Sequence, residues 1–73
     1  MSAEIKDLKQ EVQELNSQMA ACESRVNELR TQEDPAAGVF YHQEIFSLQQ
    51  EKLRLQVEIE FREKKINRLL LEA

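Results

Sequence analysis

The residues that could do chemistry are few in this chain. It has one cysteine, Cys22, and one histidine, His42, with Glu44 two residues further on. A thiolate can act as a nucleophile, and an imidazole can transfer protons or bind a metal. A structural zinc site needs four ligands, which one cysteine and one histidine cannot supply. We therefore expect Cys22 to be a small buried hydrophobic residue and His42 a surface residue, with no metal and no cofactor.

Charged side chains are abundant, but they are not arranged for catalysis. No pair of carboxylates lies in an apolar sequence context that would shift a pKa, and the chain has neither a glycine-rich phosphate loop nor a Ser/His/Asp set. Glutamates surround the one basic cluster, and the formal net charge is −4. The sequence predicts no enzymatic activity, no small-molecule substrate and no binding to nucleic acid or membrane. The basic cluster consists of Arg62, Lys64, Lys65 and Arg68.

Length and composition indicate how the chain must fold. A chain of 73 residues seldom buries a self-sufficient core without disulfides, a metal or a partner. One cysteine cannot form an internal disulfide, and one glycine and one proline among 33% charged residues are typical of long helices. There is no membrane-length apolar run and no signal-peptide pattern. The sequence predicts a coiled-coil segment with a cytoplasmic location.

The strongest pattern in the sequence begins at Ile5. From there to Leu29, apolar residues recur at alternating spacings of three and four, which is the spacing of the core positions of a heptad coiled coil. The pattern predicts one helix over residues 3–33, about 45 Å long at 1.5 Å per residue. The first seam consists of Ile5, Leu8, Val12, Leu15, Met19, Cys22, Val26 and Leu29.

The heptad pattern stops where the only proline, Pro35, and the only glycine, Gly38, occur together. Proline disrupts a helix interior at a cost of about 3 kcal/mol but fits the first turn of a helix. We therefore predict a turn over residues 34–40, with Asp34 as an N-cap that opens a second helix. We expect Val39, Phe40 and Tyr41 to cover the open end of the core.

A second seam with the same spacing follows in a predicted helix over residues 41–72. Its core positions are shifted by five residues relative to the first seam, and neither a stutter of four nor a stammer of three residues gives that shift. Two helices joined by a turn are therefore favoured over one long rod. The second seam contains Ile45, Leu48, Leu55, Ile59, Ile66 and Leu69, with Lys52 and Arg62 at the two remaining core positions.

The two helices could pair in two ways. A parallel homodimer would place Lys52 against Lys52 and Arg62 against Arg62 in a partly desolvated core. A fold-back would place these side chains beside Cys22 and Val12, where each can extend outward to water. The seams have equal length and their midpoint is Ala37, inside the break. The sequence thus favours an all-α fold, an antiparallel coiled-coil hairpin of two long helices.

Flanking charges favour the same arrangement. Parallel pairing brings like charges together beside the seams, whereas antiparallel pairing brings mostly opposite charges together. Exposed ion pairs contribute only about 0–1 kcal/mol each, so they support the hairpin without deciding it alone. The expected antiparallel pairs are Arg25 with Glu51, Glu11 with Lys65, and Lys9 with Glu63.

The second helix carries a further set of apolar residues away from its seam. A two-helix hairpin cannot bury them, and an exposed stripe of this size usually marks an interface. They predict either pairing of two hairpins into a four-helix bundle or binding of another helical protein. We call this set the outer stripe; it consists of Phe46, Leu53, Val57, Phe61 and Leu71.

One local pattern competes with the helix. Residues 53–61 alternate apolar and polar side chains, which is the pattern of a β-strand. No second strand candidate exists to pair with this segment, and no breaker separates it from its helical flanks. We therefore predict helix here. If this segment were a strand, its apolar residues would not line up with the rest of the outer stripe, which is defined by helical spacing.

A heptad seam, a Pro/Gly break and a second helix rich in Gln, Glu and Leu resemble segments of long coiled-coil proteins. Motor stalks, golgins, motor adaptors and centrosomal scaffolds have stalk and regulatory segments of this kind. The resemblance implies a segment excised from a longer cytoplasmic or cytoskeletal protein.

The predicted function is that of a structural and protein–protein interaction module. We expect the hairpin to form a homodimer through its second helix or to present the outer stripe to another helical protein. Two other hypotheses stay open from the sequence. One is a parallel homodimerising stalk kinked at Pro35, and the other is an adaptor segment that orders only on binding a partner.

Overall fold

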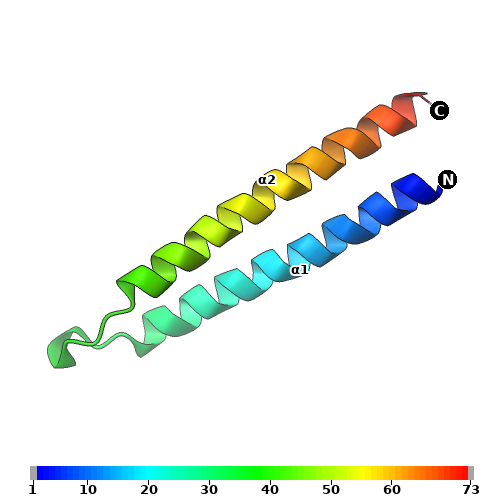
Figure 1. The fold of residues 1–73 in the computed structure, drawn as a ribbon. Helices are drawn as coiled ribbons and strands as arrows, with labels where there is room; N and C mark the ends of the chain where they lie inside the picture. The colour runs from blue at the N-terminus through cyan, green and yellow to red at the C-terminus, as the bar shows by residue number, and fades with distance from the viewer. Residues whose placement is uncertain (1, 73) are drawn as a thin grey trace.

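The fold is an all-α hairpin, as the sequence predicts. The computed structural model describes residues 2–72 and contains helices α1 (Ala3–Gln32) and α2 (His42–Glu72), joined by a loop with a short 3₁₀ turn η1 (Pro35–Ala37). The two helices run antiparallel, side by side, along a rod of 60 × 14 × 11 Å (Figure 1). Both ends of the chain lie at one end of the rod and the loop at the other. The chain folds back on itself, so it does not form a stalk kinked at Pro35.

The start of α1 is fixed by a serine cap. The Oγ atom of Ser2 accepts a hydrogen bond from the backbone N–H of Ile5 at 3.2 Å, which satisfies one of the free donors of the first turn. At the other end, the backbone N–H of Glu33 donates to the carbonyl of Leu29 at 3.1 Å before the chain becomes extended. Both helices are within one residue of the predicted ranges 3–33 and 41–72.

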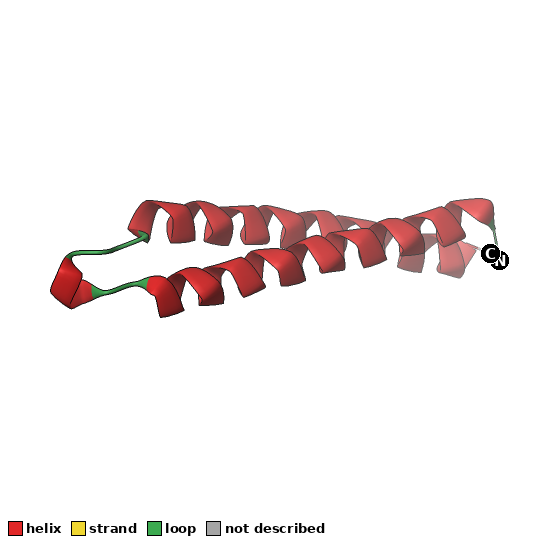
Figure 2. Ribbon diagram, turned by 90° about the horizontal axis from the view of Figure 1, so that it is seen from below, coloured by secondary structure: helices red, strands yellow, loops and turns green. Residues whose placement is uncertain are grey.

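The loop reverses the chain through a closed turn (Figure 2). Asp34 and Val39 exchange two backbone hydrogen bonds, of 2.9 and 2.8 Å. Between them, the Asp34 carboxylate caps η1 by accepting from the N–H of Ala37 at 3.3 Å. Gly38 follows with φ +73°, a left-handed conformation that glycine adopts without strain. Asp34 therefore caps a single turn, and the prediction that it opens the second helix was wrong.

The residues after the turn divide between the core and the surface. Val39 and Tyr41 are half-buried at the loop end of the hairpin, whereas the side chain of Phe40 is exposed. The Phe40 ring stacks on His42, with centroids 5.1 Å apart and planes 15° from parallel. The expectation that all three residues cover the core end was therefore wrong for Phe40. Its ring packs on His42, which is itself exposed, and not on the seams.

The core is the interface between the two seams. Every position of both seams is buried or half-buried, and the most enclosed side chains, Leu29 and Leu55, are each 1% exposed. At the end opposite the turn, Ile5, Leu8 and Ile66 form a buried cluster, against which Val12 and Leu69 pack. Cys22 is a half-buried free thiol.

The segment with strand-like alternation lies inside α2 (Figure 2). Leu55 and Ile59 are buried, while Leu53, Val57 and Phe61 are exposed. Residues two apart on an α-helix point about 200° apart at 3.6 residues per turn. The alternation therefore arises because α2 is apolar on two opposite faces, one facing α1 and one facing outward.

Candidate interaction surface

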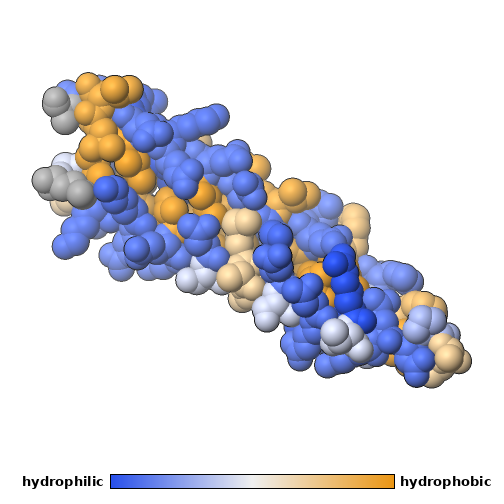
Figure 3. All heavy atoms as spheres, turned by 180° about the vertical axis from the view of Figure 1, so that it is seen from behind, coloured by the Kyte–Doolittle hydropathy of each residue, from blue (hydrophilic) through white to orange (hydrophobic). Residues whose placement is uncertain are grey.

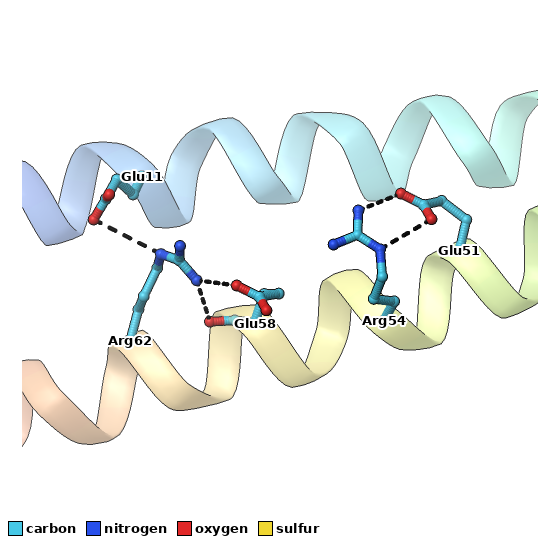
Figure 4. Close-up of polar contacts among 5 residues, drawn as sticks. All are labelled: Glu11, Glu51, Arg54, Glu58 and Arg62. Carbon is cyan, nitrogen blue, oxygen red and sulfur yellow. Dashed lines mark hydrogen bonds and ion pairs between the residues drawn. The ribbon is translucent and has the colours of Figure 1, made fainter.

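Two basic side chains of the second seam reach out of the helix interface to carboxylates on α1. The Nζ atom of Lys52 lies 3.7 Å from Glu23, and the Nε atom of Arg62 lies 3.7 Å from Glu11. Arg62 also donates through Nη1 to the Glu58 carboxylate at 2.6 Å and to its carbonyl at 3.0 Å (Figure 4). Both residues are half-buried, as expected when a charged side chain extends from a core position toward water.

Several flanking charges pair within one helix instead of across the interface. Arg25 pairs with Glu28 at 3.3 Å, and Arg54 pairs with Glu51, three residues before it. Side chains three or four residues apart on one helix are neighbours at little entropic cost, so these local pairs compete well with pairs between helices. Among residues 2–72, the structure does not form the predicted pairs of Arg25 with Glu51 and of Lys9 with Glu63.

Lys65 does pair across the interface, but with a different glutamate from the predicted one. Its Nζ atom lies 3.4 Å from Glu4. The predicted partner, Glu11, is engaged by Arg62. A side chain beside an antiparallel seam can reach two positions of the facing helix that are seven residues apart. For Lys65 these positions are Glu4 and Glu11. Because Arg62 pairs with Glu11, Lys65 pairs with Glu4.

Glu51 and Arg54 form a bidentate ion pair on the surface of α2. Two hydrogen bonds, from Nε at 3.1 Å and from Nη2 at 2.5 Å, join the guanidinium to both carboxylate oxygens (Figure 4). These hydrogen bonds hold the pKa of Glu51 below its usual value and raise the pKa of Arg54. The pair is open to solvent, so it orders the surface of α2 more than it stabilises the fold.

We predict that an NMR titration of the side-chain carboxyls places the pKa of Glu51 below the usual glutamate value. A lowered folded-state pKa adds stability above the usual glutamate value of 4.5, and this contribution is lost as the pH falls through the lowered pKa. Arg54→Gln should return the Glu51 midpoint toward 4.5. Lys64→Gln, also on α2 but outside this pair, is the control and should leave it unchanged.

The outer stripe lies on the surface of α2. Its five side chains are between 59% and 88% exposed, although the second seam on the same helix is buried or half-buried. Apolar side chains appear at the surface along the rod between hydrophilic ones (Figure 3). The corresponding positions of α1, including Lys6, Gln10, Gln13, Ser17 and Ser24, are exposed and mostly polar. Only one of the two helices therefore offers a second apolar face.

Two exposed apolar side chains were not part of the predicted interface. Leu70 is 51% exposed near the end of α2, and Phe40 is 49% exposed at the turn. Leu70 is adjacent in sequence to Leu71 of the outer stripe. The run Leu69-Leu70-Leu71 is the signal that could have identified it, since a helix cannot bury three consecutive residues on one face.

Shallow hollows lie on the surface of the rod. One of about 210 Å³ lies on α2 between Phe61, Lys64, Lys65 and Arg68, and one of about 320 Å³ lies on α1 between Lys6, Lys9, Gln10 and Gln13. Each is formed by residues at i, i+3, i+4 and i+7, the four that make a socket for a side chain of a packed helix. A third, of about 300 Å³, lies at the start of α2 along residues 40–44.

Residues 2–72 bring together no group of three or more His, Cys, Asp or Glu side chains that could hold a metal ion. Neither helix in this part of the chain combines the length and the apolar character needed to cross a membrane.

Comparison of the chain with protein-family models, with curated proteins and with solved structures finds no match. The feature of the molecule that indicates a function is therefore the exposed outer stripe of α2.

Proposed function

We propose that this chain is a structural interaction module that self-associates through the outer face of α2. Two hairpins would pack their outer stripes together to form a four-helix bundle, and so hold the protein that contains them in a defined geometry. The observation that supports this proposal is the exposure of all five stripe side chains on a helix whose opposite face already closes the hairpin.

The stripe is not needed to fold one hairpin. The seams bury their apolar positions against each other, and burying the stripe as well requires a surface from outside the hairpin. A second copy supplies a complementary apolar surface, since each copy of a twofold dimer contributes the same patch. Dimerisation would also enlarge the core, which is small in a 73-residue chain.

Phe61→Asp should disperse the dimer and leave the hairpin folded. Phe61 is 70% exposed, so a charge there meets water in the single hairpin but apolar side chains in the dimer. Sedimentation equilibrium over a range of concentrations should give a dimer mass for the wild type and a monomer mass for Phe61→Asp. Both proteins should have the same helical circular dichroism at concentrations where the wild type is monomeric.

Ser17→Asp is the matched control, because it places the same charge on the exposed polar face of α1. It should leave the dimer mass unchanged. A wild type that stays monomeric at high concentration would contradict self-association and would leave the stripe to a partner of different sequence. If Phe61→Asp unfolds the monomer, its outward position is wrong.

We propose the cytoplasm as the compartment, with a scaffold or cytoskeletal protein as the setting. Its support is the single cysteine, whose thiol is free and half-buried on the first seam. Free thiols persist in reducing compartments. Fluorescence microscopy of the tagged full-length protein tests this location.

A further inference from the structure

We propose that the two hairpins pair α2 against α2 in antiparallel directions, with the twofold axis beside Val57. This inference rests on the proposed self-association and adds its geometry. The occupant of the outer stripe is then a second copy of the chain in one defined direction.

The spacing of the residues on the outer face of α2 is the first support. Seven exposed positions follow one another along this face at intervals of 4, 3, 4, 4, 3 and 4 residues, a series that reads the same in both directions about Val57. Leu71 continues the face three residues further on, at the level of Gln43 of the second copy. An antiparallel twofold axis beside Val57 therefore superimposes this set on itself. In order, the positions are Phe46, Gln50, Leu53, Val57, Phe61, Lys64 and Arg68.

The side chains that this axis brings to the same level are chemically complementary. Val57 meets Val57 of the second copy, and on each side Leu53 meets Phe61, so the centre of the contact is apolar. Further out, the neutral amide of Gln50 faces Lys64. At the ends, the ring of Phe46 faces the guanidinium of Arg68, a pairing in which the aromatic face attracts the cation.

Parallel pairing of the same faces lacks this complementarity. Each residue would then face its own copy, so Lys64 would meet Lys64 and Arg68 would meet Arg68. Like charges opposed across an interface oppose association. In the antiparallel arrangement no charged residue of this face meets its own kind.

The hollow on α2 fits the same arrangement. It is formed by Phe61, Lys64, Lys65 and Arg68 and lies at the levels reached by Phe46 and Gln50 of the second copy. Its volume is about 210 Å³, and Phe61 gives it an aromatic wall. The socket on α1 is lined by lysines and glutamines, without an aromatic side chain.

Spin labels test the direction of pairing. In a Cys22→Ala background, single cysteines at Ser47, Gln56 or Asn67 carry the label, and pulsed electron resonance measures the distance between the two copies. Antiparallel pairing about Val57 separates the labels along the axis by roughly 30, 3 and 30 Å, from 1.5 Å per residue. Parallel pairing gives three similar short distances, because each label then lies at the level of its own copy.

Two variants at one position give an independent test through affinity. Gln50→Glu faces Lys64 in the antiparallel dimer and adds two attractive pairs, which should tighten dimerisation about threefold or more. Gln50→Lys faces the same lysine and should weaken it by a similar factor. In a parallel dimer each variant faces itself, so both would weaken association.

The outcomes separate this inference from the proposed function. A dimer with three short label distances, or one weakened by both Gln50 variants, keeps self-association and overturns the antiparallel arrangement. A wild type that is monomeric overturns both. Long distances at Ser47 and Asn67 with a short one at Gln56, together with opposite effects of the two Gln50 variants, support both self-association and the antiparallel arrangement.

Discussion

Replacing Leu55 by aspartate is expected to unfold the hairpin. Leu55 is 1% exposed in the centre of α2, and aspartate would place a charge without a partner among apolar side chains. Truncating a buried leucine to alanine alone costs about 2–5 kcal/mol, and the core of so small a domain supplies about 3–5 kcal/mol in total. The charge adds to that loss, so no folded population should remain.

Circular dichroism measures the effect directly. Helices without tertiary packing are marginal in water, so Leu55→Asp should lose most of the helical signal and the cooperative melt. Leu53→Asp is the matched control, because Leu53 lies two residues away on the outer face and is 59% exposed. It should keep the helical signal while weakening the proposed dimer. Equal helicity of the two variants would show that the inner and outer faces of α2 are misassigned.

Replacing Lys52 and Arg62 together by leucine is expected to stabilise the hairpin and to reduce its specificity. Exchanging buried ion pairs for apolar contacts is often stabilising by about 1–4 kcal/mol. Both side chains are partly exposed, at 39% and 24%, so we expect the lower part of that range, about 1–2 kcal/mol. In a domain of this size that raises the melting temperature by roughly 5–10 °C.

The loss of specificity should appear as a second arrangement of the chain. With leucine at both positions, the second seam no longer opposes parallel pairing by like charges, and polar core residues commonly select one arrangement of a coiled coil. With labelled chains diluted in unlabelled ones, so that only distances within one chain are measured, spin labels at Lys6 and Arg68 should show one short distance in the wild type and an added long one in the variant.

The neutral polar variant Lys52→Gln with Arg62→Gln is the control for the leucine pair. It removes the ion pairs without adding apolar contacts, so its melting temperature should be below that of the wild type. The distance between labels at Lys6 and Arg68 should remain single and short. A leucine variant that melts lower than the wild type would show that the ion pairs stabilise the hairpin more than apolar contacts do.

The sequence predicted the hairpin because its strongest determinants are periodic. An unbroken alternation of threes and fours identifies a helix face by itself, and the shift of five residues between the seams requires a break. Pro35 and Gly38 place that break, because their backbone preferences are local. These features need no knowledge of neighbouring side chains, and the helix ends follow from them to within one residue.

The details that the sequence missed depend on competition between nearby partners. Glu51 could bind Arg25 across the interface or Arg54 on its own helix, and only the packed side-chain positions decide between them. Asp34 is a suitable cap for either a long helix or a single turn, and Gly38 at φ +73° ends the turn at once. Phe40 pointed away from the core for a similar reason, since the path of the loop determines which side chains face inward.

The position of the chain ends at one end of the rod determines how the hairpin would respond to tension (Figure 1). A force applied between Ala3 and Glu72 would separate the helices layer by layer, beginning with the cluster of Ile5, Leu8 and Ile66. At each moment the force has to separate only one pair of facing seam positions. The hairpin should therefore open at a low and nearly constant force. The loop keeps the helices joined, so they re-pair within one chain when the tension falls. The hairpin would thus act as a reversible source of extra length.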